Sequence, residues 1–447
     1  MLYVSDIINK CNGKLLCGDS SLPLNNFSKD TRTINKGDVY IGIKGESFDG
    51  NEFYKDAFDK GASVCILDNI NEEISEEYKN KTIVKVDDTI KCIGILAKYK
   101  RSLYNIPVIA VTGSVGKTST KEMIANVLST KYKVLKTEAN YNNHIGLPLT
   151  ILKLTNEDIL VVEMGMNNLG EISYLTDIAR PTIGVITNVG MAHIGNLGSR
   201  ENILKAKLEI TEGLSGPLII NNDNDMLHNN LEYIKSLCKV ITIGITNKSD
   251  YMAKEIQDKT FKVENNIIES PINNSAFIYN SLVAYVIGKI YNISIDKIKE
   301  GIKSMKLISN RLEYKHTNNG VTIIDDTYNS SLDAIKASLE ILAKEKGKRK
   351  VAVIGDILEV GDYNEEVHRK IGEILLNNNL DIIITIGNNT KYTDTYLKEK
   401  GYHNLYHFNN EKESHKEIES ILKSGDVVLF KASHSMQLGN IVKYLMQ

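Results

Sequence analysis

The sequence predicts an α/β protein whose central part is a doubly wound parallel sheet. Three observations lead to this fold class. From residue 106 onward, short apolar runs typical of buried strands alternate with longer segments of helical periodicity. The chain has 447 residues, room for about two to four domains, and 42% of them are hydrophobic, enough for a core in each. The same alternation returns after residue 311, so we expect a second α/β domain there.

The first part of the chain, residues 1–86, is expected to form a small α/β domain. Strand-like runs cover residues 38–43, 63–67 and 82–86, and a helical stretch covers residues 52–60. Residues 87–104 have the pattern of a helix that leads into the second part.

The second part, residues 87–310, carries the longest alternation. Its predicted strands are residues 108–111, 134–137, 159–163, 183–188, 218–221 and 240–243, and helices at residues 275–291 and 295–305 close it. The third part, residues 311–447, has predicted strands at 322–325, 350–354, 381–386 and 427–430. Because ligands of such sheets bind at the carboxyl ends of the strands, the loops that follow the central strands are expected to converge.

Composition excludes several classes of function. There are 54 basic and 56 acidic residues, and a net charge of −2 argues against an extended nucleic-acid-binding surface. The start of the chain has no signal-peptide pattern and no apolar run is long enough to span a membrane, so a cytoplasmic location is expected. Five scattered cysteines without a C-x-x-C pair are expected to be free thiols.

A glycine loop follows the first central strand and precedes a helical run at residues 118–128. Gly113 and Gly116 would let backbone N–H groups approach phosphate oxygens, Lys117 would supply a positive charge, and the Thr118 hydroxyl could reach Mg²⁺. The common Walker A spacing would need another glycine at Val111. The loop therefore predicts nucleotide binding, with a glycine turn that caps a structural helix as the alternative. Its residues are Gly113, Ser114, Val115, Gly116, Lys117, Thr118 and Ser119.

Other polar residues follow the ends of predicted strands. Glu163 ends a buried strand, where it could face a nucleotide-bound metal or lie solvated in a turn. His193 lies beyond another strand end and could be functional or a hydrogen-bonded structural histidine. Asn140, Asn142 and Asn143 could donate to a substrate carboxylate, although Asn-rich turns are ordinary in this chain.

Two lysines, Lys205 and Lys207, lie two positions apart on a predicted helix. Helical periodicity alone favours a solvated side chain for both.

Taken in order, these motifs resemble those of the Mur ligases of peptidoglycan synthesis. The Glu-Met-Gly-Met segment and the absence of an Asp-Asn-Pro-Arg motif favour the branch of the family that adds a dipeptide. The resemblance covers nearly the whole chain, through Ser28-Lys-Asp-Thr-Arg32, Phe48-Asp-Gly-Asn51, the glycine loop, Asn140-Tyr-Asn-Asn143, Glu163-Met-Gly-Met166, Asp325-Asp-Thr-Tyr-Asn329, and Gly355-Asp356 with Glu359 and His368.

The resemblance implies the three-domain Mur ligase architecture and an ATP-dependent, amide-forming ligase. It implies that a carboxylate of UDP-N-acetylmuramoyl-tripeptide is activated as an acyl phosphate and that the amine of D-alanyl-D-alanine displaces the phosphate. It also implies ATP and Mg²⁺ as cofactors, and a cytoplasmic monomer that serves cell-wall biogenesis, cell shape and cell division.

The resemblance further assigns roles to residues. Lys117 would act on the outer phosphates, and Thr118 and Glu163 would hold Mg²⁺. Lys207 matches a lysine that is carbamylated and so becomes a metal-binding anion, with His193 near the same second metal. Asn280, Arg311, Asp326 and Tyr328 match nucleotide contacts, and Ser28, Thr31, Arg32, Asn51, Asn140, Asn142 and Asn143 match substrate positions.

The chain also departs from the family pattern. His144 stands where an acid is usual, Ser330-Ser-Leu332 follows Asn329 in place of an Asn-Pro-like continuation, and Lys431-Ala-Ser-His434 replaces a Lys-Gly-Ser-Arg pattern. If that Arg contacts the dipeptide, His434 would give a weaker, pH-dependent contact.

The sequence leaves three alternative functions open. A related ligase could add the third amino acid of the peptide or glutamate to folate. A Mur-ligase-like subunit of an amidotransferase complex is another alternative, although that relative carries a cysteine zinc ribbon. A nucleotide-dependent switch without a transferable substrate is the third.

Overall fold

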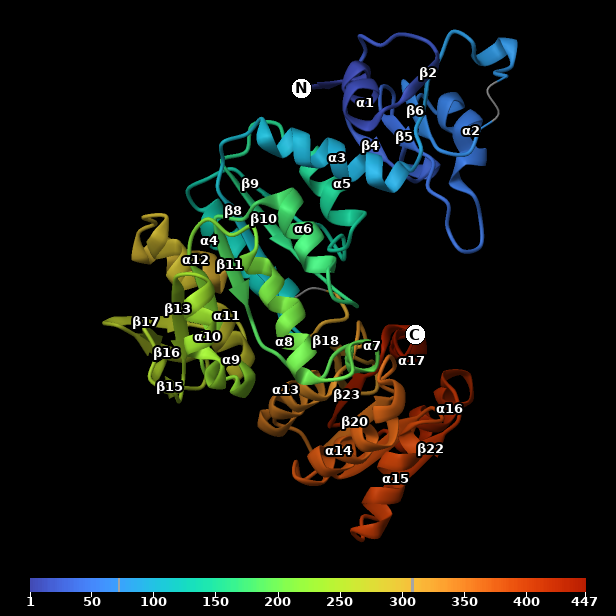
Figure 1. Cartoon of the computed structure of the whole chain (residues 1–447). Helices are drawn as coiled ribbons and strands as arrows, with labels where there is room; N and C mark the ends of the chain where they lie inside the picture. The colour runs from blue at the N-terminus through green and yellow to red at the C-terminus, as the bar shows by residue number, and fades with distance from the viewer. Residues whose placement is uncertain (71–72, 307–308) are drawn as a thin grey trace.

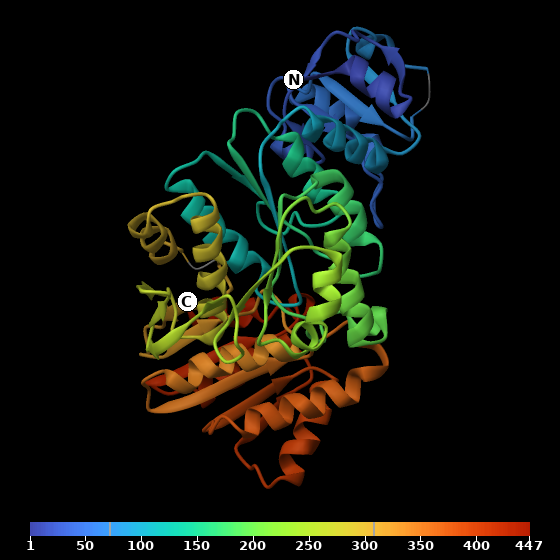
Figure 2. The ribbon, with the colours of Figure 1, turned by 60° about the vertical axis from the view of Figure 1, so that its left-hand side comes forward.

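The computed structural model describes residues 1–70, 73–306 and 309–447. Three α/β units follow one another along an elongated molecule, with the N-terminal unit at one end and the C-terminal unit at the other (Figures 1 and 2). Each of the three main sheets draws its strands from one of the spans 1–86, 87–310 and 311–447. The exact domain boundaries stay a prediction. Among the described residues, no helix is long and apolar enough to cross a membrane.

The N-terminal unit is built on a five-stranded sheet in the order β2-β7-β6-β5-β4. The four strands from β7 to β4 are parallel, and β2 runs antiparallel to β7. The three strands and the helix expected here are confirmed in position, whereas β2 and the two-residue β4 were not predicted. The strands are β1 (Leu2–Tyr3), β2 (Lys14–Cys17), β3 (Pro23–Leu24), β4 (Phe27–Ser28), β5 (Val39–Ile41), β6 (Val64–Leu67) and β7 (Thr82–Lys85), and the helices are α1 (Val4–Cys11), η1 (Thr31–Thr33), η2 (Gly50–Phe53), α2 (Tyr54–Asp59) and η3 (Glu76–Tyr78).

The central unit contains a seven-stranded sheet in the order β14-β13-β12-β11-β8-β10-β9, and every pairing in it is parallel. The predicted doubly wound sheet is thereby confirmed. The strands are β8 (Val108–Thr112), β9 (Val134–Lys136), β10 (Ile159–Glu163), β11 (Ile183–Ile186), β12 (Leu218–Asn221), β13 (Val240–Gly244) and β14 (Tyr251–Met252). The order reverses at β8, and such a switch point is where ligands bind in open α/β sheets.

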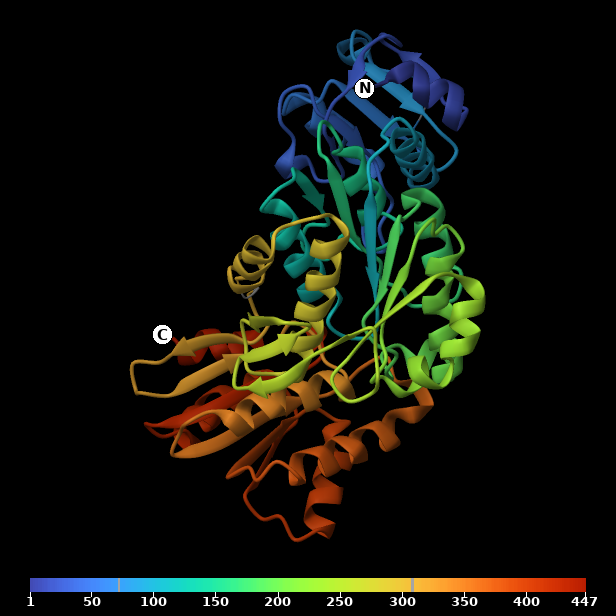
Figure 3. The same ribbon diagram turned by 90° about the vertical axis from the view of Figure 1, so that its left-hand side faces the viewer.

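Helices cover both faces of this central sheet (Figure 3). They are α3 (Thr89–Ser102), α4 (Lys117–Ser129), α5 (Gly146–Leu152), α6 (Glu171–Ala179), α7 (Ile194–Leu197), α8 (Arg200–Leu208), η4 (Glu209–Thr211), α9 (Asp225–Asn229), α10 (Leu231–Leu237), α11 (Ser275–Ile290) and α12 (Ile295–Lys303). A small antiparallel sheet of β15 (Lys254–Gln257), β16 (Thr260–Val263) and β17 (Asn266–Glu269) was not expected. All four residues of β15 are exposed, so that strand lacks the apolar run that reveals a buried strand.

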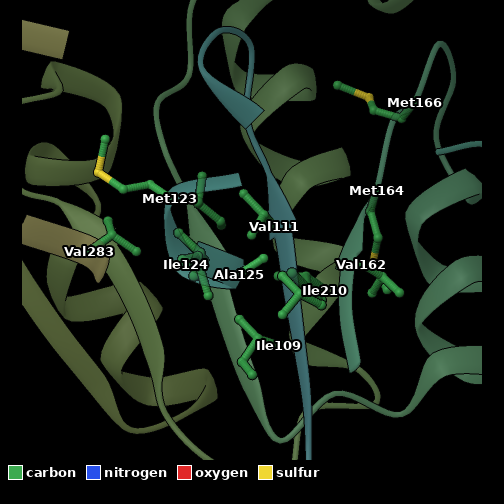
Figure 4. Close-up of a cluster of buried hydrophobic side chains, with 14 of the residues drawn as sticks. Ile109, Val111, Met123, Ile124, Ala125, Val162, Met164, Met166, Ile210 and Val283 are labelled. Atoms are coloured by element: carbon green, nitrogen blue, oxygen red, sulfur yellow. The ribbon is translucent and has the colours of Figure 1, made fainter. Parts of the chain in front are cut away.

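The buried strand β8 anchors the centre of this unit. All five of its residues are buried, because helices cover both faces of the sheet. Figure 4 shows Ile109 and Val111 of β8 close to Ile124 of α4, with Val283 of α11 on the far side of α4. Each fully buried aliphatic side chain of this kind contributes about 1.5–3 kcal/mol. The strand and α4 are therefore rigid supports for the loop between them.

The C-terminal unit has a six-stranded sheet in the order β18-β19-β23-β20-β21-β22, parallel except for β18. Its four predicted strands are confirmed, and β18 and β22 were missed. The elements are β18 (Glu313–His316), β19 (Thr322–Asp325), α13 (Leu332–Lys344), β20 (Arg349–Gly355), η5 (Gly361–Tyr363), α14 (Asn364–Leu376), β21 (Ile382–Ile386), α15 (Thr390–Glu399), β22 (Leu405–Phe408), α16 (Glu411–Ile421), β23 (Asp426–Lys431), η6 (His434–Met436) and α17 (Gly439–Leu445).

Candidate functional site

A cavity of about 570 Å³ lies between the central and C-terminal units. It opens at the carboxyl ends of β8 and β10, where the sheet order predicts a ligand site. In Figure 3 the central sheet stands between the two outer units, and its strands run toward the C-terminal one. From the central unit the cavity is lined by residues 114–119, Asn142, Asn143, Glu163, His193 and Asn280, and from the other side by Arg311, Asp326, Tyr328, Glu359 and Lys431.

The glycine loop joins β8 to α4 in a conformation that needs its glycines. Gly113 has φ +148°, and a Cβ there would lie 1.9 Å from Thr187 Oγ1. Gly116 has φ +85° and stands directly before the first residue of α4. The N–H groups of the first helical turn have no acceptor within the helix, so they can meet a phosphate.

Asn188, which sequence reasoning did not single out, holds this loop. Its backbone carbonyl accepts from the Ser114 N–H at 3.1 Å, and its Oδ1 accepts from the Val115 N–H at 2.9 Å. Its Nδ2 donates back to the Val115 carbonyl at 3.1 Å. The amides of Ser114 and Val115 are thus used within the protein, and the N–H groups from Gly116 onward are the ones open to phosphate. One signal in the sequence could have identified Asn188: it follows β11, the strand that pairs with β8.

Lys117 lies across the mouth of the loop. Its ammonium donates to the Gly113 carbonyl at 2.8 Å and to the Ser114 carbonyl at 3.4 Å. Burial lowers the pKa of Lys117, Glu163 opposes that effect and Arg311 adds to it. A bound anion would add to the stabilisation that Glu163 gives to this half-buried ammonium.

Glu163 is a buried carboxylate whose two oxygens differ in their hydrogen bonding. Its Oε1 accepts from Asn142 Nδ2 at 2.8 Å, and its Oε2 is buried without a hydrogen-bond partner among the described residues. Asn142 therefore positions Glu163. Thr118 is buried at the start of α4, and both residues line the cavity. A buried carboxylate oxygen without a donor is a feature expected of a cation ligand.

The structure separates the two lysines of α8. Lys205 is exposed, whereas Lys207 is 1% exposed. Within the described part of the chain, the Lys207 ammonium has no hydrogen-bond acceptor and no acidic partner, and burial together with Lys117 holds its pKa well below the ordinary value. The interpretation of Lys207 as a solvated lysine, drawn from periodicity, was wrong because this side of α8 packs inward.

His193 lies at the start of α7 with φ +64°. Its Nδ1 is 3.1 Å from Glu359 Oε2 of the C-terminal unit. Burial lowers the pKa of His193, and Lys117 contributes in the same direction while Glu359 opposes it. The ring is therefore biased toward its neutral form, the form that binds metals. No group of three or more His, Cys, Asp or Glu side chains in the described ranges could hold a metal by itself.

The opposite wall of the cavity comes from the C-terminal unit. The Arg311 guanidinium lies 3.9 Å from the centre of the Tyr328 ring. Asp326 forms a buried ion pair with Lys431 and accepts from Ser338 Oγ at 2.6 Å. These groups could contact a planar base and a ribose, while Asn280 faces them from α11 and accepts from Thr120 Oγ1 at 2.8 Å.

Apart from Asn143, the remaining predicted substrate residues do not line this cavity. Arg32 is exposed and pairs with Asp30, whose pKa it lowers to about 2. The Asn51 amide is already occupied, since it donates to Asp49 and Asp68 and accepts from the Asp68 N–H. Ser28 Oγ and Thr33 Oγ1 share a hydrogen bond at 2.8 Å, and Thr31 and Asn140 also lie away from the cavity. Asn143 lines it, but its side chain accepts from the Gly146 N–H at 2.9 Å.

The site combines a phosphate loop after β8, an acid at the end of the neighbouring strand β10, and a second α/β unit on the other side of the cavity. Together these features define an ATP-dependent ligase of the Mur type. Family models agree: residues 111–288 match the Mur ligase middle domain, and residues 310–434 match the Mur ligase glutamate ligase domain. The chain belongs to the Mur ligase family.

Within that family, the chain is similar to enzymes named UDP-N-acetylmuramoyl-tripeptide--D-alanyl-D-alanine ligase. The protein of that name from Bacillus subtilis is 35% identical over 95% of this chain and 93% of its own length. The one from Escherichia coli is 31% identical over 86% and 85%. A crystal structure of MurF from Acinetobacter baumannii matches with a TM-score of 0.88 at 27% identity over 99% and 98%.

The MurF ligase from Thermotoga maritima, solved in complex with ADP, matches with a TM-score of 0.80 at 28% identity over 94% and 97%. The resemblance read from the motifs and the α/β fold class are thereby confirmed.

Proposed function

We propose that the chain joins D-alanyl-D-alanine to UDP-N-acetylmuramoyl-tripeptide, with ATP as the source of activation, in peptidoglycan precursor synthesis. The observation that carries this proposal is the cavity between the central and C-terminal units, which Lys117 and Glu163 line from one side and Arg311 and Tyr328 from the other. Lys207 does not line this cavity, but it lies close enough to lower the pKa of His193, which does. The names of the relatives supply the two substrates.

The chemistry requires two anions to meet. A carboxylate oxygen of the tripeptide attacks the γ-phosphorus of ATP, the bond to ADP breaks, and an acyl phosphate forms. The neutral amine of the dipeptide then attacks the acyl carbon, and the tetrahedral intermediate expels phosphate as the nitrogen loses a proton. Lys117 and the amides at the start of α4 reduce the repulsion, and each well-placed donor of this kind is worth about 3 kcal/mol.

The residues present fit Mg²⁺ and a carbamate. Glu163 Oε2, which lacks a partner in the described ranges, and the Thr118 hydroxyl would hold one Mg²⁺, which neutralises phosphate charge when bound. Lys207 is buried and has no counter-ion in the part of the chain that the structure describes, and its pKa is lowered. A larger fraction of its amine is therefore neutral and can react with CO₂. The resulting carbamate would place an anion where His193 approaches, which suits a second metal.

The remaining assignments follow the family. Asn280 and Arg311 would hold the nucleotide, and Asp326 and Tyr328 would approach its ribose and adenine. The UDP-sugar would bind on the N-terminal unit, through Ser28, Thr31, Arg32 and Asn51, and Asn140, Asn142 and Asn143 would act near the tripeptide. For Asn51 the proposal requires its amide to leave the aspartates that it now contacts. We further propose a cytoplasmic monomer with domains at residues 1–86, 87–310 and 311–447.

The test measures phosphate release with each substrate combination. Release should require ATP, UDP-N-acetylmuramoyl-tripeptide and D-alanyl-D-alanine together, and the product mass should equal tripeptide plus dipeptide less one water. L-alanyl-L-alanine should be a poor substitute, because reversed stereochemistry misplaces the attacking amine. Steady ATP hydrolysis without an amine would favour a nucleotide switch, and coupling of a single amino acid to a UDP-sugar dipeptide would favour the third-residue ligase.

A further inference from the structure

A segment of the C-terminal unit packs closely on the loop that carries His193. The Gly195 N–H donates to the Glu359 carbonyl at 3.2 Å, and the Tyr363 hydroxyl donates to the Gly198 carbonyl. A Cβ on Gly195 would lie 2.7 Å from the Glu359 carbonyl oxygen and 2.7 Å from the Gly361 nitrogen, so only glycine permits this approach. Docking of the two units therefore places residue 359 beside residue 193.

The contact between the two side chains determines which ring nitrogen carries the proton. His193 Nδ1 lies 3.1 Å from Glu359 Oε2. A carboxylate oxygen can only accept, so Nδ1 must carry the hydrogen in this contact. In a neutral imidazole that leaves Nε2 with its lone pair, and both residues line the cavity that holds Glu163 and Lys117.

We propose that Glu359 is a positioning residue that holds His193 as the Nδ1–H tautomer, with Nε2 directed to the metal, and that docking of the C-terminal unit thereby completes the metal site. Metal-binding histidines commonly donate their other N–H to a carboxylate, which fixes the ring and strengthens it as a ligand. Here that carboxylate comes from another unit, so metal affinity depends on docking. The inference rests on the second metal of the proposed function.

The backbone at position 359 suggests the variant to use. Glu359 has φ +62°, a conformation that glycine adopts without strain, so Glu359→Gly removes the carboxylate without opposing the local fold. Glu359→Gln keeps an oxygen that can accept from Nδ1. Glu365→Ala is the matched control, because Glu365 is an exposed acid nearby that does not line the cavity.

The first measurement is the tautomer of His193 in metal-free protein, by long-range ¹H–¹⁵N NMR with His193→Gln for assignment. Wild type, Glu359→Gln and the control should show the Nδ1–H form. Glu359→Gly should populate the Nε2–H form. An unchanged Nδ1–H signal in Glu359→Gly would overturn the proposal.

The second measurement is Mn²⁺ affinity in the presence of a non-hydrolysable ATP analogue, followed by the EPR signal of free Mn²⁺. Loss of an outer carboxylate typically weakens metal binding about 10–100-fold, and we expect that range for Glu359→Gly. Glu359→Gln should lie within a few-fold of wild type, and the control should not change. Equal affinity of Glu359→Gly and the control would contradict the proposal.

The experiments can refute the proposed ligase function and the proposed role of Glu359 independently of each other. If the wild type does not couple the dipeptide but Glu359→Gly alters tautomer and Mn²⁺ affinity, the substrates are wrong and the role of Glu359 stands. If the wild type couples the dipeptide and Glu359→Gly changes neither property, the role of Glu359 is wrong and the ligase function stands.

Discussion

The strongest prediction concerns Lys207, which is buried and has no counter-ion among the described residues. An unmodified ammonium here would place a positive charge beside Lys117 and beside the proposed Mg²⁺. A carbamate reverses that charge and supplies metal-binding oxygens. Lys207→Ala would remove the proposed anion, and one lost electrostatic group in a transition state costs about 3–4 kcal/mol, or about 10²–10³-fold in kcat. We expect a folded protein with kcat lowered by at least that factor.

The assay compares Lys207→Ala with Lys205→Ala, a change of the same kind on the exposed side of α8. Phosphate release by the Lys205 variant should be close to that of wild type. Short carboxylic acids should partly restore the Lys207 variant, because they can enter the vacated space and return an anion. Removal of dissolved CO₂ should slow the wild type, and bicarbonate should restore it.

The reasoning would be refuted by an active wild-type enzyme whose intact mass and electron density show a bare amine at Lys207. Equal turnover of the two lysine variants would refute it as well. Lys207 would then be a structural lysine whose burial serves packing.

Three further predictions follow from the site. Lys117→Ala should remain folded by circular dichroism but lose about 10²-fold or more in kcat, since one charge on the outer phosphates is gone; near-normal turnover would remove the loop from the mechanism. Asn188→Ala leaves the Val115 N–H without its acceptor and destabilises the binding conformation of the loop by about 1–3 kcal/mol, so calorimetry should show ADP binding weakened about 5-fold or more. Finally, the proposed ATP contacts are divided between the central unit and Asp326 and Tyr328 of the C-terminal unit, so we expect the C-terminal unit to close about a hinge near Arg311 when ligands bind. Small-angle scattering should then show a smaller radius of gyration with an ATP analogue and the UDP-sugar peptide together, and an unchanged radius would count against this hinge.

Much of the fold could be predicted because it depends on local pattern. Strands β8, β10, β11 and β12 of the central sheet are fully buried, so each is a short apolar run that the sequence displays directly. Strand β15 was missed for the opposite reason, since all its residues are exposed. Strand β4 has two residues, too few for any periodicity.

The candidate site was partly predictable. Residues 113–119 form one contiguous loop, and the glycines, lysine and threonine of a phosphate cradle stand side by side in the chain. Asn188 was missed, because its bond to Val115 joins residues 73 positions apart. Asn142 was expected to contact the substrate, whereas in the structure its side chain donates a hydrogen bond to Glu163.

By itself, the sequence determined the α/β class, the phosphate loop and the family, because each depends on residue types at fixed spacing along the chain. The tertiary structure decided which of two lysines on α8 is buried, which oxygen of Glu163 lacks a partner among the described residues, and which carboxylate contacts His193. These depend on which face of a helix packs inward and on contacts such as the one that joins His193 to Glu359, 166 positions away. Burial and distance determine the charge and the tautomer of a side chain, and neither can be read from one segment of the chain.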